Sequence, residues 1–363
     1  MTNTPKKNKK EKKKKKGNGF GKKIFWAFLL MVCLGLSITV FELYKTIFSS
    51  NVILKNKQSG FLYIHSHATY SEVIEILKKK EILINIESFD WLASRLDYKN
   101  HVHPGKYKLK PHMSNKDLII LLKSGRQTPV KITINNIRTK EELISKISKL
   151  VEADSTNLIQ LLTSKEFLKP YALDPTNALS LIMPNSYEVY WNTDATKLLN
   201  KIGNNYLKFW NQERKQKAQN MELTPAEIIV LASIVEKETN KNAEKPEIAG
   251  VYINRLKSGR KLEADPTLVF ASGDFNIRRV LNIHREIDSP YNTYKYEGLP
   301  PGPICMPSAA SIDAVLNYEK HHFMYFCAKP DFSGFHQFSR TFEEHLIVAR
   351  KFRKELCKRN IMN

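Results

Sequence analysis

The sequence predicts an α+β protein of 363 residues with a single membrane helix near its N-terminus. Two observations carry this prediction. Residues 24–41 form an uncharged apolar run (IFWAFLLMVCLGLSITVF), which is long enough for a membrane helix. Beyond this run, short strand-like segments alternate with helices that begin at Ser or Thr caps. With 42% hydrophobic residues the chain is too apolar to be disordered, and its length suggests about two folded domains.

Positive charge is concentrated directly before the apolar run. Residues 1–23 hold eleven Lys and one Glu, so this tail carries +10 of the formal net charge of +22. Because short basic flanks stay in the cytoplasm, the rest of the chain is predicted to cross the membrane. No A-x-A-like cleavage site follows the run, so residues 24–44 are predicted to be an uncleaved anchor rather than a signal peptide or a buried core helix. For the tail, attraction to anionic lipid is favoured over nucleic acid, and no nucleic-acid partner is predicted.

Three segments repeat the order of a short strand followed by a capped helix. Strands are expected at residues 61–65, 106–110 and 130–135. Each precedes a hydroxyl residue with an acid three places on, in the pairs Thr69 and Glu72, Ser114 and Asp117, and Thr139 and Glu142. Such pairs satisfy the free N–H groups of a helix start. Since one repeat cannot bury its own apolar face, we expect the three units to pack into a small α+β module.

A further helix is expected at residues 86–96, between the first two repeats. A strand, two helices and a strand in this order resemble a LysM-like fold, and modules of that kind often bind glycans. Residues 45–129 are therefore predicted to be a LysM-like subdomain, followed by a larger α+β domain over residues 130–363. A spacer that binds nothing is an equally open interpretation of the subdomain.

The helix predicted over residues 224–240 carries the first candidate for chemistry. Thr224 as the cap, Pro225 at the first helical position and Glu227 at the third make a strong helix start. At 100° per residue Glu236 continues the apolar face of this helix, whereas Glu238 lies about 200° away from it. A carboxyl group against apolar neighbours has a raised pKa and donates a proton near neutral pH. Glu236 is therefore a candidate acid, with an ordinary solvated glutamate as the alternative.

The loops that follow this helix are dense in Pro, Tyr and amide side chains. They include LEADPT at residues 262–267, SPYNTY at 289–294 and GLPPGPI at 298–304. Tyr rings cover the apolar faces of sugars and amides bond their hydroxyls, so these loops suit a sugar-binding cleft, although plain connecting loops are the alternative. The spacing of the C-terminal histidines does not build a metal site on one helix, so no metal and no cofactor are predicted.

Several motifs together make the sequence resemble a known family. They are ASIVEKET (232–239), INRL (253–256), DPT (265–267), YNTY (291–294), GLPPGPI (298–304) and the pattern H-x-F-S-x-T-x-x-x-H (336–345). With the basic tail, the anchor and the LysM-like segment, they resemble the YceG-like, or MltG, family of endolytic lytic transglycosylases of bacterial cell walls. The resemblance covers most of the chain from about residue 24.

The resemblance implies a membrane-anchored lyase that cleaves the MurNAc–GlcNAc bond of nascent peptidoglycan strands, forms 1,6-anhydro-MurNAc ends and so terminates strand elongation. It implies Glu236 as the catalytic acid and base. It also implies five substrate-positioning residues: Asp265, Tyr291, Asn292, Tyr294 and His336.

The same resemblance implies partners and a location. The partners are peptidoglycan glycan strands, the membrane, and peptidoglycan synthases or division proteins. The location is the inner membrane, with a cytoplasmic N-terminus and a periplasmic catalytic domain at residues 130–363. Two other functions stay open, a muramidase that uses water and a non-catalytic scaffold that binds the cell wall.

Overall fold

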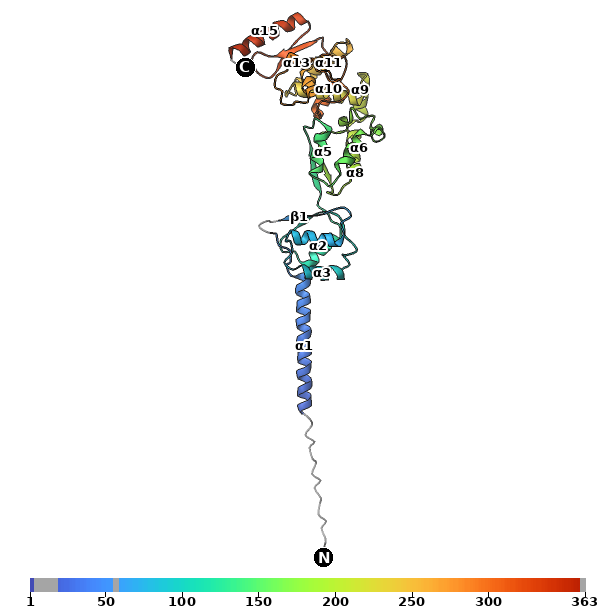
Figure 1. Ribbon diagram of the computed structural model, residues 1–363, viewed down its shortest axis with the longest axis vertical. Helices are drawn as coiled ribbons and strands as arrows, with labels where there is room; N and C mark the ends of the chain where they lie inside the picture. The colour runs from blue at the N-terminus through green and yellow to red at the C-terminus, as the bar shows by residue number, and fades with distance from the viewer. Residues whose placement is uncertain (3–18, 55–58, 360–363) are drawn as a thin grey trace. The chain divides into compact units, whose positions relative to one another are not determined.

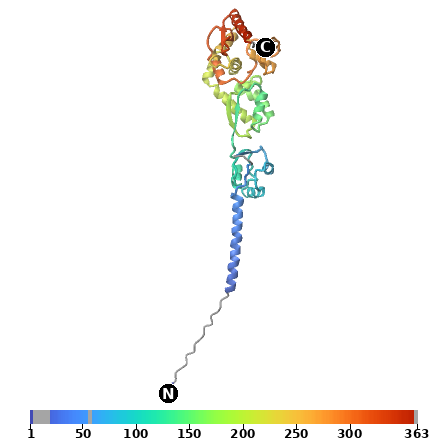
Figure 2. The same ribbon diagram turned by 90° about the vertical axis from the view of Figure 1, so that its left-hand side faces the viewer.

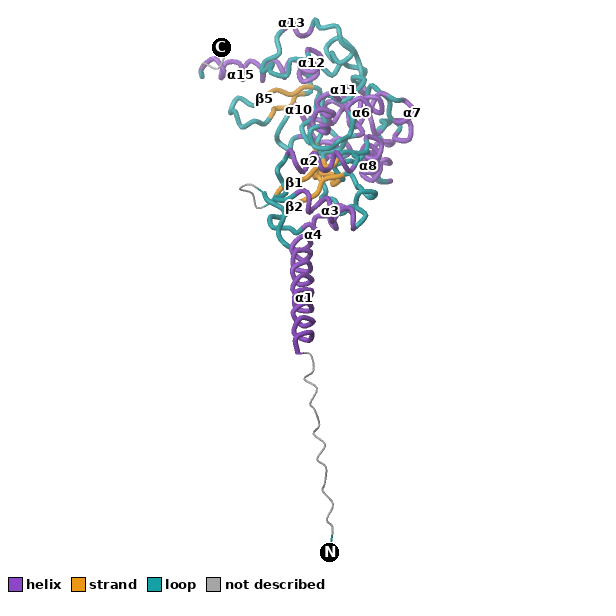
Figure 3. Tube along the Cα trace, turned by 60° about the horizontal axis from the view of Figure 1, so that its bottom comes forward, coloured by secondary structure: helices purple, strands orange, loops and turns teal. Residues whose placement is uncertain are grey.

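The computed structural model describes residues 1–2, 19–54 and 59–359 of the chain. Most of the predicted basic tail over residues 1–23 lies outside these described residues. The chain divides into two compact units, Met1–Gln127 and Thr128–Asn363. Helices predominate in both, and the strands of the described residues pair into three two-stranded antiparallel sheets (Figure 3). This is the α+β class that the sequence predicts.

The N-terminal helix α1 (Gly19–Phe48) is one uninterrupted element of 30 residues (Figures 1 and 2). At 1.5 Å per residue it is about 45 Å long, which exceeds the roughly 30 Å hydrocarbon core of a bilayer. Residues Phe20–Phe48 are apolar enough to cross a membrane, and apart from Ile47 the apolar side chains of this stretch are exposed. The helix is therefore compatible with a single-pass membrane anchor.

The rest of the first unit has the predicted order of strand, two helices and strand. Strands β1 (Gly60–Ile64) and β2 (Gly105–Leu109) pair antiparallel, with α2 (Tyr70–Lys79) and α3 (Ile86–Arg95) between them in the chain. Helix α4 (Asn115–Lys123) follows β2. The predicted caps Thr69 and Ser114 both form complete capping boxes, with Glu72 and Asp117.

Buried side-chain amides connect the end of α1 to the other elements of the first unit. The side-chain amide of Asn115 donates a hydrogen bond of 2.9 Å to the carbonyl oxygen of Thr46, in the last turn of α1. Asn51 donates a second bond, 2.6 Å long, to the side-chain oxygen of Asn115. Ile47 of α1 also packs against the apolar core of this unit. The end of the apolar helix is therefore part of the folded unit.

The third predicted repeat belongs to the second unit, whereas the other two belong to the first. Its strand β3 (Val130–Ile134) belongs to the second unit and pairs antiparallel with β4 (Asn185–Val189). Its helix α5 (Lys140–Ser148) is capped by Thr139 as predicted. The prediction of one module of three repeats is wrong because the partner of β3 lies about fifty residues later in the chain, beyond the reach of a local pattern.

The second unit is built around α10 (Pro225–Glu238). This helix packs against α11 (Lys245–Lys257), α12 (Asp265–Ser272) and α14 (Ala309–Leu316). Strands β5 (Tyr325–Ala328) and β6 (His336–Ser339) form a hairpin covered by α15 (Phe342–Lys358). The remaining helices are α6 (Ser155–Thr163), α7 (Lys165–Leu168), α8 (Ala195–Phe209), α9 (Gln212–Asn220) and α13 (Asn282–Arg285), with 3₁₀ turns at Lys169–Tyr171 and Ala178–Leu181.

Candidate active site

Helix α10 is buried on all of its sides. Its start is fixed by the predicted capping box, in which Glu227 accepts from the Thr224 backbone N–H at 2.7 Å and the Thr224 hydroxyl accepts from the Glu227 N–H at 3.2 Å. Every residue from 228 to 235 is buried. A helix with apolar contacts all round has no single apolar face, so the direction of a side chain does not by itself decide its environment.

Glu236 lies in a strongly polar pocket. Its Oε2 accepts hydrogen bonds from Lys245 Nζ at 3.1 Å, from the Ser308 hydroxyl at 2.6 Å and from the Ser311 hydroxyl. Ser308 caps α14, so the carboxylate also faces the N-terminus of a helix, which favours negative charge. Lys245 is only 4% exposed, and this ion pair fixes α11 to α10.

The polar contacts set the pKa of Glu236. Burial raises the pKa, but the hydrogen bonds from Ser308, Ser311 and Lys245, together with the lysine charge, outweigh burial and hold the pKa below its usual value. The prediction that apolar neighbours raise the pKa of Glu236 is wrong, because the neighbours are hydroxyl groups and a cation. The carboxylate of Glu236 is stabilised as an anion that ties three helices together.

Glu238 has the raised pKa that was predicted for Glu236. Its Oε1 accepts a hydrogen bond of 2.6 Å from the hydroxyl of Tyr252, which is buried in α11. Burial raises the pKa of Glu238, the Tyr252 hydrogen bond lowers it, and the negative charge of Asp265 raises it, with a result of about 7. A carboxyl group with this pKa is available both as a proton donor and as a base near neutral pH.

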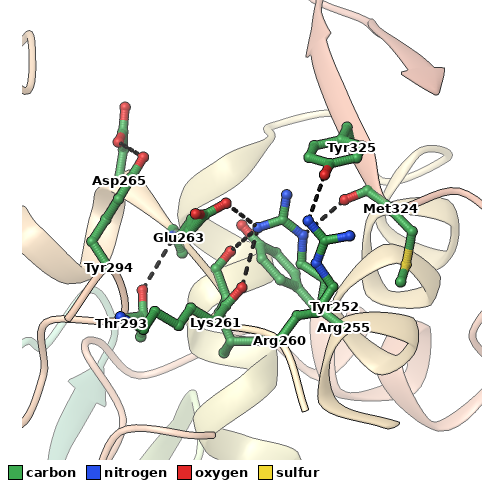
Figure 4. Close-up of polar contacts among 12 residues, drawn as sticks. Tyr252, Arg255, Arg260, Lys261, Glu263, Asp265, Thr293, Tyr294, Met324 and Tyr325 are labelled. Atoms are coloured by element: carbon green, nitrogen blue, oxygen red, sulfur yellow. Dashed lines mark hydrogen bonds and ion pairs between the residues drawn. The ribbon is translucent and has the colours of Figure 1, made fainter. Parts of the chain in front are cut away.

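Asp265 and Tyr294 lie beside this acid and contact each other. The Tyr294 hydroxyl donates a hydrogen bond of 2.6 Å to Asp265 Oδ1 (Figure 4). The guanidinium of Arg285 stacks over the Tyr294 ring at 4.6 Å from its centroid. Burial, followed by the bond to Asp265, raises the pKa of Tyr294, so its hydroxyl keeps its proton and remains a donor.

Two cavities flank Glu238, and Glu238 and Asp265 line both of them. The first cavity, of about 530 Å³, is lined mainly by basic and apolar side chains, among them Arg138, Lys237, Phe270, Arg278 and Arg279. The second, of about 500 Å³, is rich in aromatic side chains, among them Tyr252, Tyr294, Tyr325, Phe326 and Phe342. The acid therefore lines two cavities of different chemical character.

Arg255 assembles the wall of the aromatic cavity. It is 7% exposed, and its Nε donates to the Met324 carbonyl oxygen at 2.8 Å. Its Nη1 donates to the carbonyl oxygen of Leu262 at 2.8 Å and to Glu263 Oε2 at 2.9 Å. Figure 4 shows the guanidinium group among Glu263, the chain near Lys261 and Met324. One side chain thus joins α11, the loop before α12, and β5.

Asn292 is a structural residue of the loop that carries Tyr294. It is 0% exposed, and its amide nitrogen donates to the carbonyl oxygens of Arg285 at 2.9 Å and Ile287 at 2.8 Å. Its side-chain oxygen accepts from the backbone N–H of Tyr294 at 3.0 Å and of Lys295 at 3.2 Å. These four bonds use the full capacity of an amide, so in this structure the Asn292 side chain holds the loop, and its predicted contact with substrate stays a prediction.

Tyr291 packs into the protein rather than into either cavity. Its ring lies 4.6 Å from the ring of Phe270. A Cβ on Gly302 would come within 2.4 Å of the Thr176 carbonyl oxygen and 3.0 Å of the Tyr291 hydroxyl. The GLPPGPI loop therefore needs glycine at position 302 to lie this close to Thr176 and Tyr291, and Tyr291 packs against the loop at that point.

His336 is bound to a buried carboxylate. Its Nδ1 lies 2.7 Å from Glu244 Oε2, and its backbone N–H donates to Glu244 Oε1 at 2.5 Å. The imidazole also meets the Phe326 ring edge-on, with centroids 5.3 Å apart. His336 is not among the described residues that line the two cavities.

Of the six predicted site residues, the structure brings Asp265 and Tyr294 together beside Glu238, with Glu236 two residues along the same helix.

Sequence reasoning missed Glu238, Tyr252 and Arg255. One signal for Glu238 was present, because the run AEIIVLASIV is apolar in every direction around the helix, which is typical of a fully buried helix. Arg255 belongs to the INRL motif, but no sequence signal identifies the partners of Arg255 or Tyr252, which lie in other segments. Among the described residues, no group of three or more His, Cys, Asp or Glu side chains is placed to hold a metal ion.

Residues 62–351 match the model of the YceG-like family. The chain is 29% identical over 327 residues to a Bacillus subtilis (strain 168) protein named endolytic murein transglycosylase, covering 82% of this chain and 86% of the relative. It is 28% identical over 266 residues to a protein of the same name from Streptococcus pneumoniae (strain R6), covering 64% of this chain. The match spans about half of that relative, 48% of its length.

A solved structure has a related fold. The crystal structure of a putative yceG-like protein from Listeria monocytogenes superposes with a TM-score of 0.53 at 24% sequence identity. The match covers 81% of this chain and 99% of the Listeria chain. At this identity the likeness concerns the fold.

Proposed function

This chain belongs to the YceG-like family, and from this premise we propose that it is a lyase, an endolytic peptidoglycan transglycosylase that cleaves glycan strands between MurNAc and GlcNAc. The names of its relatives from Bacillus subtilis and Streptococcus pneumoniae support this activity. The observation in this chain that carries the proposal is the carboxyl group of Glu238. Its pKa is raised to about 7, and it stands between two cavities in a wall of aromatic and charged side chains.

In the proposed reaction one carboxyl group acts twice. Protonated Glu238 gives its proton to the glycosidic oxygen as the bond from that oxygen to MurNAc C1 breaks. The MurNAc C6 hydroxyl then attacks C1, and its proton returns to the Glu238 carboxylate. The product ends in 1,6-anhydro-MurNAc, water is not consumed, and the acid is regenerated.

The neighbours of Glu238 suit this double role. The Tyr252 hydroxyl stabilises the carboxylate that forms after the first step, whereas the charge of Asp265 favours return of the proton. Asp265 also offers a negative charge beside the developing positive charge of an oxocarbenium-like sugar. Tyr294 holds the Asp265 carboxylate in one orientation.

Glu236, the acid favoured by sequence reasoning, is the second candidate for the same role. It belongs to the same motif and is half-buried, but its Oε2 already accepts from Lys245, Ser308 and Ser311. These donors favour the ionised form, which is the wrong form for a proton donor at neutral pH. The electrostatics therefore support Glu238 as the acid and Glu236 as a structural anion.

The two cavities also support endolytic cleavage. An enzyme that cuts inside a strand must bind sugars on both sides of the broken bond, and two cavities that share Glu238 and Asp265 in their walls offer that space. The aromatic cavity offers ring faces for sugar stacking. A non-catalytic scaffold would give no reason for a neutral-pH acid between them.

A muramidase is the second candidate function, because the Asp265 carboxylate beside Glu238 is also placed to assist an attacking water. The mass of the products separates the two reactions. We expect the full chain in detergent to release fragments from purified sacculi that are lighter by one water and resist borohydride reduction. Reducible ends would instead establish hydrolysis, and the absence of any fragment from folded protein would exclude both.

The proposed setting of the activity is the membrane surface. Helix α1 anchors the chain, the basic residues before it stay in the cytoplasm, and the folded units lie on the outer side of the inner membrane. Cleavage there would terminate the elongation of nascent strands. Peptidoglycan synthases or division proteins are the proposed partners in this role.

A further inference from the structure

We propose that the basic cavity beside Glu238 binds carboxylate groups of the peptide carried by the glycan strand, so that the chain prefers peptide-bearing glycan to bare glycan. This inference rests on the proposed function and adds a substrate preference to it. The cavity, of about 530 Å³, brings together four cationic side chains: Arg138, Lys237, Arg278 and Arg279. They come from three separate segments, the end of the β3–α5 loop, α10, and the chain between α12 and α13.

The cavity is unusual in its charge. Its four cationic side chains face a single carboxylate, Asp265, while Glu238 carries its proton, which leaves a net charge of +3. In the aromatic cavity, by contrast, Arg255 and Arg285 are matched by Glu263 and Asp265. The two sides of the acid therefore differ, with a charge-balanced aromatic hollow on one side and a cationic hollow on the other.

The cationic groups are available to a ligand. Among the described residues none of the four forms an ion pair with an acidic side chain, and Lys237, Arg278 and Arg279 are exposed. The Arg138 guanidinium lies over the Phe275 ring at 4.6 Å from its centroid, which orients it without neutralising it. Like charges gathered in one hollow repel each other, and a bound anion would relieve this repulsion.

The position of the cavity points to the anion. Arginine forks bind carboxylates and phosphates with paired hydrogen bonds. Glu238 lines the cavity, so a group bound there belongs to a sugar next to the broken bond. In peptidoglycan the anionic substituent nearest to that bond is the lactyl-linked peptide of MurNAc, which ends in carboxylates. A phosphate at a lipid-linked strand end has similar chemistry and is a separate arm of the test.

The test compares binding of two soluble ligands to the full chain in detergent, a disaccharide with its peptide and the same disaccharide with its lactyl carboxyl group capped as a neutral amide in place of the peptide. Calorimetry should find the peptide-bearing form bound at least about tenfold more tightly, the effect of one hydrogen bond to a charged group. The difference should shrink as salt is raised. In the Arg278→Gln/Arg279→Gln variant it should fall to about twofold or less. Arg350→Gln/Lys354→Gln on α15, with the same change in charge, should keep the full difference.

Several outcomes would overturn the inference. Equal binding of the two ligands by the parent protein would show that the peptide is not recognised. An unchanged preference in the Arg278→Gln/Arg279→Gln variant would show that the basic cavity does not bind the peptide. Competition by inorganic phosphate or a pyrophosphate-linked disaccharide, with no effect of the peptide, would assign the site to the lipid-linked end. Because binding is measured apart from cleavage, a chain that recognises the peptide but yields no anhydro product would refute only the proposed function.

Discussion

The hydroxyl of Tyr252 and the carboxyl of Glu238 are joined by a hydrogen bond of 2.6 Å between two adjacent helices, α10 and α11. The Tyr252 hydroxyl donates a hydrogen bond to Glu238, whose carboxyl group is otherwise shielded from water by burial. Two residues earlier on α10, Glu236 accepts from two hydroxyls and an ammonium group. The pKa of Glu236 is therefore lowered and the pKa of Glu238 is raised, although both acids lie at the same end of one helix.

Glu238→Gln should lower glycan cleavage by at least about a hundredfold, because it removes the proton that the glycosidic oxygen needs while keeping the shape of the side chain. Release of anhydro fragments from sacculi measures the effect. Glu236→Gln is the matched control and should retain most of its cleavage per folded molecule. A folded, inactive Glu236→Gln beside an active Glu238→Gln would return the catalytic role to Glu236.

Tyr252→Phe should move the alkaline limb of the pH–rate profile upward by about one pH unit, the equivalent of one hydrogen bond. The Tyr252 hydroxyl lowers the pKa of Glu238, so its removal keeps the acid protonated to higher pH. The rate of cleavage across neutral pH measures the shift. A limb that stays in place would mean that Glu238 does not set it.

Stability should depend on pH with opposite signs at the two glutamates. The pKa of Glu238 is raised from 4.5 to about 7, so its contribution is full below pH 4.5 and is lost as pH rises through 7. Glu238→Gln should therefore gain stability relative to the parent from about pH 5 to about pH 8. The pKa of Glu236 is lowered, so its contribution is present above pH 4.5 and is lost as pH falls.

Glu236→Gln should accordingly lose most stability at neutral pH and little in acid. Thermal unfolding midpoints of the two variants and the parent, measured across the same pH series, test both signs at once. Parallel curves for all three proteins would contradict this assignment of charge.

Thr69→Ala should destabilise the first unit by about 1 kcal/mol, because it removes the N-cap of α2. Cleavage per folded molecule should stay unchanged, since the proposed acid lies in the second unit. Unfolding and cleavage measured on the same preparation separate the two effects. A loss of cleavage as large as that of Glu238→Gln would place the first unit in the chemistry.

A C-terminal fusion to a reporter that is active only outside the cytoplasm should be active, because the basic residues before α1 favour a cytoplasmic N-terminus. Reporter activity relative to the amount of fusion protein is the measurement. A stable but silent fusion would reverse the proposed orientation.

The sequence predicted those parts of the fold that depend on local chemistry. The caps Thr69, Ser114 and Thr224 occupy single positions whose hydrogen bonds lie within four residues, and all three begin helices where expected. The pairing of β3 with β4 was missed because it joins segments far apart in the chain. Local patterns specify helix starts but not the partner of a strand.

The candidate site was predicted only in part for a similar reason. Asp265 and Tyr294 were predicted as substrate-positioning residues from the family resemblance, and they do contact each other. The direction in which Glu236 and Glu238 point from α10 did not predict the surroundings of either side chain, because α11 and α14 both pack against this helix. Which acid meets a cation and which meets a tyrosine depends on Lys245 and Tyr252, and no spacing in the sequence fixes those contacts.

The wall built by Arg255 has a consequence for the order in which the chain is made. Glu238 and Tyr252 leave the ribosome well before Met324, which Arg255 needs as a partner, and before Phe342, which closes the aromatic cavity. Because a domain generally folds as a unit, the aromatic cavity is complete only once Met324 and Phe342 have been made and α15 has packed against β5.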